Sequence, residues 1–507
     1  LLGLSVVLTA CDVDNTLDPI EGEVISNVAL SASGLDFSKY VSVGASFTAG
    51  FTDGALFKAS QENSFPNLLS KKFAMANGGA FTQPLMNDNI GGFLIGGVKR
   101  ANPRFWFNGS APVILNAIPT TEIAAIQAGP YNNMGIPGIK SYHLDVVGYG
   151  ALAALPNANP YFVRMASNPG KSVLEDAVDQ NPTFFTLSEI GGNDVLGYSI
   201  AGGDGVDRTG DINAAAYGPN DITDPNVFAA KFSKAVTELT KNGAKGVVTT
   251  VPYVTSLPYF TTVPHNAIPL DGATATQLNA AFAAYNKGLQ DLLNAKLANL
   301  LPAQVLPLLV NYDQAEVDRR KINFVAGQNA VLILDESLSN LTPINPRLTN
   351  MRQATSKDLL VLPSSSFLGT TVGGNPQFIN GVSVPLADKW VLTEDEISKV
   401  KTATDSYNNI INAVASSKNL AVVDFKAILE QASTTGISSG NFVLTTQFVT
   451  GGLVSLDGVH LTARGYAVLA NKVLEAIDKA YGSNFTKATN GLIDAGNYPT
   501  NYSPALR

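Results

Sequence analysis

Short apolar runs that end at glycine or proline alternate with segments of helical spacing, and this alternation constrains the fold most. The run 183–187 stops before Gly191, and the β-branched run 246–251 is closed by Pro252. Between them, residues 227–240 place phenylalanine, valine and leucine on one helical face. Buried strands separated by amphipathic helices are typical of parallel βαβ units. We therefore predict an α/β fold with a mostly parallel sheet.

Other segments extend this plan in both directions. We expect further strands at 40–43 and 421–425, and helices at 63–73, 276–297, 393–415 and from Thr462 onward. The chain is predicted to form a single domain over 35–482, with an insertion around 311–390 that mixes short strands with Ser/Gly/Asn-rich loops. The Asn/Gly/Pro-rich tail at 483–507 is expected to be loosely ordered.

The beginning of the sequence is apolar and leads to the single cysteine. Residues 1–10 end in small residues just before Cys11, which resembles the end of a bacterial lipoprotein signal peptide, cleaved before a cysteine that receives the lipid. Residues 11–34 then read as an acidic tether. A buried N-terminal strand is the alternative. The lipoprotein interpretation predicts attachment to a membrane through a lipid on Cys11, because no other segment has an apolar run of membrane-spanning length.

Charge and histidine content exclude two classes of partner. The net charge of −8 and the lack of a basic cluster argue against nucleic acid, which requires a basic face. The three histidines, His143, His265 and His460, have no paired spacing, so no metal site is predicted. The oligomeric state is left open.

A serine stands where the first predicted strand breaks into a turn. The run Tyr40–Val43 stops at Gly44, and Ser46 is followed by small residues and Gly50. A serine at such a corner presents its hydroxyl freely, as a nucleophile must. Serines between glycines also occur in ordinary loops, so this stretch needs partners elsewhere in the chain.

Two distant stretches supply those partners. His460 precedes a predicted helix, and Asp457 lies three residues upstream, where its carboxylate can hold the imidazole as a general base. The four residues Asp457-Gly-Val-His460 are also typical of an ordinary turn at the start of a helix. Asn193, at a strand end, and a backbone N–H in the loop around Gly138 could donate to an oxyanion. The ordinary alternative is structural: Asn193 would be a turn asparagine and Gly138 a loop glycine.

Four blocks in this order resemble the SGNH, or GDSL, family of serine hydrolases. They are Gly44-Ala-Ser-Phe-Thr-Ala-Gly50, Gly135-Ile-Pro-Gly138, Gly191-Gly-Asn-Asp194 and Asp457-Gly-Val-His460. The resemblance spans about residues 38–480, with the middle insertion poorly covered. The lipobox and tether are similar to those of lipid-anchored members, which implies the bacterial cell envelope, with the outer membrane favoured.

The resemblance implies a role for each matching residue. Ser46 would be the nucleophile, His460 the base and then the acid, and Asp457 the residue that orients it. The oxyanion hole would consist of the Ser46 N–H, the Gly138 N–H and the Asn193 side chain. The implied fold is a three-layer α/β/α sandwich of flavodoxin-like arrangement with large loop insertions, and it requires no cofactor.

The sequence departs from the family pattern beside the nucleophile. Ala45 stands where an aspartate is usual, and Phe47 where a leucine is usual, which leaves open how the nucleophile loop is braced. Gly135 and Gly138 offer two registers for the backbone donor, and we favour Gly138. The predicted function is a lipid-anchored esterase or lipase-like enzyme acting on carboxylic esters. The alternatives are a non-catalytic binding or scaffold lipoprotein of the envelope, and a carbohydrate deacetylase.

Overall fold

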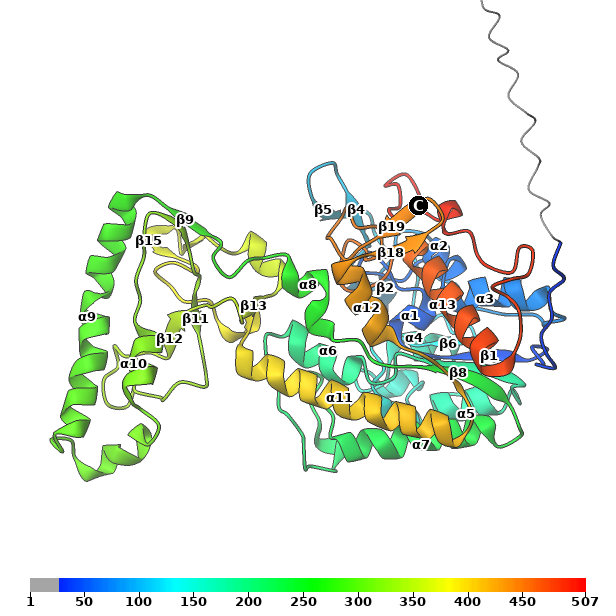
Figure 1. Ribbon diagram of the computed structural model, residues 1–507, viewed down its shortest axis with the longest axis horizontal. Coiled ribbons are helices and arrows are strands. Elements are labelled where there is room, and N and C mark those ends of the chain that lie inside the picture. Colours follow the sequence, from blue (N-terminus) through cyan, green and yellow to red (C-terminus); the bar gives the residue numbers. More distant parts are fainter. Residues whose placement is uncertain (1–26) are drawn as a thin grey trace, which may run out of the picture.

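Five parallel strands form the central sheet of the computed structural model, which describes residues 27–507 (Figure 1). Its order is β17 (Ala421–Val423), β8 (Lys245–Thr249), β7 (Phe184–Ser188), β1 (Tyr40–Gly44) and β6 (Asn133–Gly135). Every neighbouring pair is parallel. Counted along the chain, this is the doubly wound order 2-1-3-4-5. The predicted α/β class with a parallel sheet is confirmed.

The strands read as apolar runs because both faces of the sheet are covered. All five residues of β1 are buried, and so are all five of β7. Val41 and Val43 belong to one hydrophobic cluster, whereas Tyr40 and Phe184 belong to another. Successive side chains of a strand point to opposite faces, so the two clusters are the two sides of the sheet.

Helices cover each face. On the Tyr40 side lie α3 (Phe65–Ala74) and α13 (Ala463–Tyr481), and on the Val41 side lie α4 (Pro160–Met165), α5 (Val173–Val178), α7 (Pro225–Thr240) and α11 (Glu394–Ser417). Local signals fix several of their ends. The Thr462 hydroxyl accepts the Gly465 N–H at the start of α13, which ends at Gly482 in the left-handed conformation. The helices predicted at 63–73, 227–240, 393–415 and after Thr462 are confirmed.

Shorter elements follow the strands and line the edge where the parallel strands end. They are α1 (Ser46–Ala49), α2 (Lys58–Glu62), α6 (Asn193–Ile200), α8 (Pro258–Thr261) and α12 (Phe425–Thr434). Three hairpins project from the sandwich: β2 (Phe93–Ile95) with β3 (Val98–Ala101), β4 (Phe105–Phe107) with β5 (Pro112–Ile114), and β18 (Ile437–Ser439) with β19 (Phe442–Leu444).

A second lobe stands beside the sandwich, between α8 and α11 (Figure 1). It contains α9 (Gly272–Leu297) and α10 (Gln314–Arg320) with short antiparallel pairs, and it has hydrophobic clusters of its own. The pairs are β9 (Ile268–Leu270) with β10 (Gly327–Asn329), β11 (Leu332–Leu334) with β12 (Met351–Gln353), β13 (Leu359–Leu360) with β16 (Val391–Leu392), and β14 (Thr371–Val372) with β15 (Asn375–Ile379). The helix expected at 276–297 forms, but it packs within this lobe. The lobe therefore includes α9 and begins well before residue 311, where we expected the insertion.

The C-terminal tail is packed, which corrects the expectation of a loosely ordered 483–507. Phe485 is fully buried and meets the rings of Phe37 and Phe73 with centroids 6.0 Å away. Further along, the Arg104 guanidinium donates to the carbonyls of Tyr502, Ser503 and Leu506. The tail was expected to be loosely ordered because it is rich in asparagine, glycine and proline, yet its Phe485 and Tyr502 side chains are buried.

The start of the chain is described only from residue 27. The predicted partial signal peptide at 1–10, Cys11 and the tether up to residue 26 lie outside the described residues. Residues 27–34 run beside the tail, where Asn484 Oδ1 accepts the Ser31 N–H at 2.7 Å. Among residues 27–507, no helix combines the length and apolar character needed to cross a membrane.

Replacing Phe485 with alanine tests the packing of the tail. The substitution leaves a cavity in the core, so we expect Phe485→Ala to lower the free energy of unfolding by about 3–5 kcal/mol. Phe378→Ala, at a half-exposed position in β15, is the matched control and should cost less than about 1 kcal/mol. Urea unfolding measures both, and equal costs would show that the tail does not pack as described.

Candidate active site

The predicted site residues gather at the carboxyl ends of the central strands. Ser46 follows β1, Gly138 lies in the turn after β6, and Asn193 begins α6 after β7. Strands β1 and β7 are the first and third central strands in chain order, so the topological switch point lies between them. In open α/β sheets, ligands bind in the crevice at this point.

Two glycines let the nucleophile turn pack directly on the sheet. A Cβ on Gly44 would lie 2.1 Å from Thr48 Oγ1 and 2.6 Å from the Ser188 carbonyl oxygen. A Cβ on Gly135, the register partner of Gly44, would lie 2.2 Å from the Ala49 nitrogen. These positions admit no side chain, and α1 therefore starts immediately after β1 with Ser46 as its first residue.

The buried carboxyl of Glu189 braces the first turn of α1. Its two oxygens accept the N–H groups of Phe47 at 3.0 Å and Thr48 at 2.8 Å. Burial raises the pKa of Glu189 to about 8, and the backbone donors of Thr48, Ala45 and Phe47 oppose that rise. Ala45 carries no carboxylate, so the acidic group that holds this turn comes from the end of the adjacent strand β7.

Asp457 and His460 form a hydrogen-bonded pair in the turn before α13. The His460 Nδ1 lies 2.9 Å from Asp457 Oδ2, and the two side chains are 14% and 11% exposed. The other carboxylate oxygen, Oδ1, accepts the N–H groups of Val459 and His460, each at 2.8 Å. The carboxylate thereby holds both the imidazole and the turn that carries it.

The charge of Asp457 is stabilised within this turn. Burial by itself would raise the pKa of the carboxyl, but attraction to the His460 imidazole and the hydrogen bonds from His460 and Val459 lower it below its ordinary value. Gly54 donates its N–H to Asp457 Oδ2 at 2.8 Å. An ionised Asp457 fixes the imidazole tautomer that carries its hydrogen on Nδ1, which leaves Nε2 able to accept a proton.

His460 packs against the residues that follow Ser46 and makes no hydrogen bond to the Ser46 hydroxyl. The imidazole packs beside Phe51, with ring centroids 4.6 Å apart, and beside Phe47 at 5.8 Å. Within residues 27–507, neither the Ser46 hydroxyl nor His460 Nε2 makes a hydrogen bond. The structure thus brings His460 against the segment that follows Ser46 and leaves the Ser46 hydroxyl and His460 Nε2 without a hydrogen bond among the described residues.

The three predicted oxyanion donors differ in what they already bind. Among the described residues, the N–H groups of Ser46 and Gly138 have no acceptor. The Gly135 N–H, by contrast, donates to Asn133 Oδ1 at 3.0 Å, so of the two registers only Gly138 keeps a free donor. Asn193 Nδ2 donates one hydrogen to the carbonyl of Ile139, next to Gly138, at 2.9 Å. Its second hydrogen remains for a ligand.

A pocket joins the serine to the asparagine. Its empty volume is about 470 Å³, and Ser46, Glu189 and Asn193 line it together with apolar residues. Ser46 is 9% exposed, and Val459, the neighbour of His460, completes the wall. The pocket therefore connects Ser46, Asn193 and the turn that carries Asp457 and His460.

Two supporting acids were not predicted from the sequence. Glu189 directly follows the buried strand β7, and a charged residue in that place was the available signal. Asp53 is almost fully buried, and its Oδ1 accepts the Leu456 N–H at 3.0 Å while its own N–H donates to Ser455. Asp53 ties the segment after Ser46 to the turn that carries Asp457.

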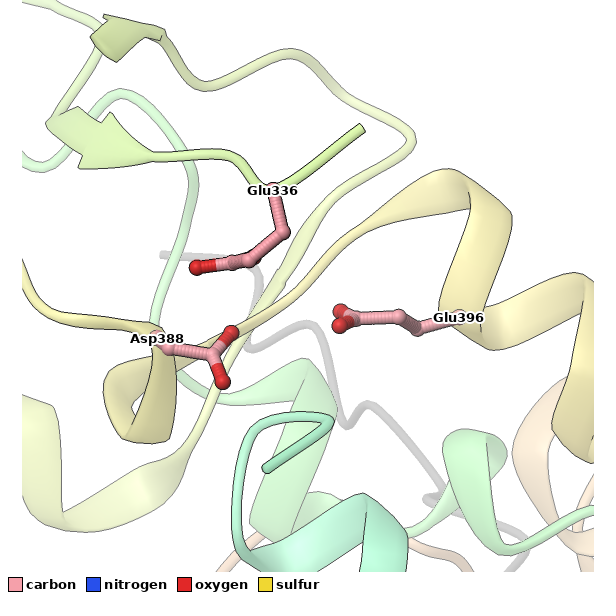
Figure 2. Close-up of side chains that lie close together, drawn as sticks. All are labelled: Glu336, Asp388 and Glu396. Carbon is pink, nitrogen blue, oxygen red and sulfur yellow. The ribbon is translucent and has the colours of Figure 1, made fainter. Parts of the chain in front are cut away.

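Three carboxylates meet where the second lobe joins the sandwich (Figure 2). Glu336, Asp388 and Glu396 place oxygen atoms within 4.8 Å of one another, an arrangement that could hold a divalent cation. Burial, followed by repulsion from Glu336 and Glu396, raises the pKa of Asp388 to about 8. None of the three lines the Ser46 pocket, so the predicted acyl-transfer chemistry does not use them.

The brace predicts a positioning role for Glu189. Glu189→Ala removes the acceptor of two N–H groups, so we expect kcat on a reactive ester to fall about tenfold to a hundredfold with KM nearly unchanged. Glu189→Gln keeps one acceptor and should recover part of the loss. The matched control is Glu175→Ala, which removes the carboxylate that caps α5. That variant should lose stability but keep its kcat, and equal kcat losses in both would refute the role.

The raised pKa of Asp388 predicts a pH-dependent effect on stability. An unfolded aspartate ionises near pH 4, whereas the folded carboxyl keeps its proton to about pH 8. Stability therefore falls as pH rises across this window. We expect Asp388→Asn to raise the urea midpoint more at pH 8 than at pH 5, measured with a chelator present. Asp395→Asn, at an exposed position of α11, is the control, and the idea fails if the Asp388 variant gains equally at both pH values.

No protein-family model, curated protein or solved structure matches this chain. The resemblance to SGNH hydrolases accordingly remains a prediction carried by four short sequence blocks. The structure adds a mixed α/β architecture with a five-stranded parallel sheet and places those blocks at one edge of it.

Proposed function

We propose that this protein is a serine hydrolase of the SGNH type that cleaves carboxylic esters through an acyl-enzyme. One observation carries the proposal: a hydrogen-bonded Asp457–His460 pair lies beside the Ser46 turn at the switch point of the sheet. The free N–H groups of Ser46 and Gly138, with the Asn193 amide, supply donors for an oxyanion. The finer description of the fold as an SGNH sandwich is part of this proposal.

Each proposed residue has one task in the first half-reaction. Ser46 Oγ attacks the ester carbonyl carbon while His460 Nε2 takes its proton, and Asp457 stabilises the imidazolium. The carbonyl oxygen becomes an anion held by the donors of Ser46, Gly138 and Asn193. When the tetrahedral intermediate collapses, the bond to the alcohol breaks, and His460 gives the alcohol its proton.

The second half-reaction uses the same groups with water. His460 accepts a proton from a water molecule, whose oxygen attacks the acyl carbon, and the carboxylic acid leaves as Ser46 regains its proton. The proposal requires the Ser46 hydroxyl and His460 Nε2 to come within about 3 Å when substrate binds, because catalytic bonds often close only in the complex.

The place of action is proposed from sequence alone. Cleavage before Cys11 would remove residues 1–10, and a lipid on Cys11 would then hold the enzyme at a membrane of the bacterial cell envelope, with the outer membrane favoured. The acidic tether would separate the catalytic domain from that membrane.

Removal of the nucleophile tests the proposal. We expect Ser46→Ala to lower kcat on a p-nitrophenyl ester by about 10⁴-fold or more and to abolish labelling by a fluorophosphonate, with the fold retained. Ser433→Ala, at an exposed position of α12, is the matched control and should keep activity and label. A wild-type protein that takes no label and cleaves no ester would favour the non-catalytic scaffold lipoprotein instead.

A further inference from the structure

An apolar groove continues from the Ser46 pocket. Its empty volume is about 460 Å³, and it shares four wall residues with that pocket: Phe47, Pro252, Leu257 and Phe425. The groove runs between α12 and α13, and the remainder of its wall includes Ile428, Leu429, Leu453, Leu461, Val468 and Leu469.

The groove offers no polar side chain to a ligand. Every side chain that lines it is apolar, and the only other lining residue is Gly465. Most of the wall is buried; Leu453 and Val468, for example, are nearly inaccessible. A sugar or a charged group would lose its hydrogen bonds to water there without replacement. A hydrocarbon chain has no hydrogen bonds to lose there, and each methylene removed from water favours binding by roughly threefold to fourfold.

Phe47 stands at the join between the two cavities. It follows the nucleophile directly, and its ring lies 6.4 Å from Phe425 and 5.8 Å from His460, measured between centroids. A substrate with its carbonyl at Ser46 therefore reaches the groove by passing Phe47. Phe47 replaces the leucine that is usual at this position, so a larger, aromatic side chain lies on that route.

The acyl side of the ester suits this apolar groove better than the alcohol side. In the proposed reaction the acyl group stays bound to Ser46 through both half-reactions, whereas the alcohol must leave and water must take its place beside His460. Apolar contacts in the groove favour the part of the substrate that stays bound, whereas the part that must exchange with water gains less from them.

We propose that this groove holds the acyl chain of the substrate and makes the enzyme selective for unbranched acyl groups of medium length over acetyl. The inference rests on the proposed function and adds its substrate class. It also separates an esterase of lipid-like substrates from a carbohydrate deacetylase, whose acetyl group would leave the groove unused.

The test compares p-nitrophenyl acetate with p-nitrophenyl octanoate. We expect the wild-type kcat/KM to be at least tenfold higher for octanoate. Ile428, half-buried at the groove, is replaced with tryptophan to fill it, and Ile428→Trp should lower kcat/KM for octanoate at least tenfold while acetate changes less than twofold. Ala427→Trp, at the exposed neighbouring position of α12, should change neither value.

Two further measurements fix the assignment. Inactivation of the wild type by alkyl fluorophosphonates should accelerate with chain length, which tests the groove without any variant. Hexyl acetate should be no better a substrate than ethyl acetate; a preference for the long alcohol would overturn the acyl assignment.

The outcomes separate this inference from the function on which it rests. If the p-nitrophenyl esters of acetate and octanoate are cleaved equally well and Ser46 is still labelled, the acyl groove is overturned and the hydrolase proposal stands. Cleavage of neither ester, together with absence of label, would overturn the hydrolase and the groove at once.

Discussion

The hydrogen bonds from Phe47 and Thr48 to the carboxyl of Glu189 hold the site together. Helix α1 has a single turn, and a helix that short is not stable by itself. The Glu189 oxygens take two of its free N–H groups, while the packing of Gly44 against Thr48 fixes where the turn begins. Among the described residues, the N–H of Ser46 is left without an acceptor, which the proposed oxyanion hole requires. With Ala45 beside the serine, the acidic side chain that holds this turn comes from the residue after the adjacent strand β7.

The sheet order explains how distant blocks of the sequence come together. Strands β6, β1 and β7 are neighbours with parallel direction, so the turns after them emerge at one edge. The last block arrives differently, because α13 packs on the sheet and its preceding turn is tied to the segment after Ser46. Tyr466 donates to the Phe51 carbonyl at 2.6 Å, and Gly54 donates to Asp457. The turn that carries His460 is therefore anchored to the segment after Ser46 by hydrogen bonds that involve neither the Ser46 hydroxyl nor His460 Nε2.

Local sequence signals were sufficient for a mostly parallel α/β fold and for several of its strand and helix ends. Helix α13 could be predicted because Thr462 caps it and its apolar stripe has helical period, and β1 because an apolar run stops at Gly44. The partner of a helix could not be predicted in this way: α9 has the same kind of apolar face whether it covers the sheet or a separate lobe. Glu189 was missed for a related reason, since a carboxyl that accepts backbone N–H groups leaves no periodic pattern.

The second lobe touches the turn that carries Asp457 and His460, and this contact accounts for a glycine within it. Gly458 has a φ of 76°, and a Cβ there would lie 3.0 Å from the Tyr259 nitrogen and 3.1 Å from Leu362 Cδ2. Tyr259, in α8, donates its N–H to the Gly458 carbonyl at 3.0 Å, and Leu362 belongs to the lobe. The lobe thus packs against the loop between Asp457 and His460, close enough that the loop can carry no side chain at its centre. Since Leu257, just before α8, lines both cavities, the chain enters the lobe from the wall of the site itself. The insertion and the site therefore share a boundary, and a change in how the lobe packs would act first on the turn that holds the base.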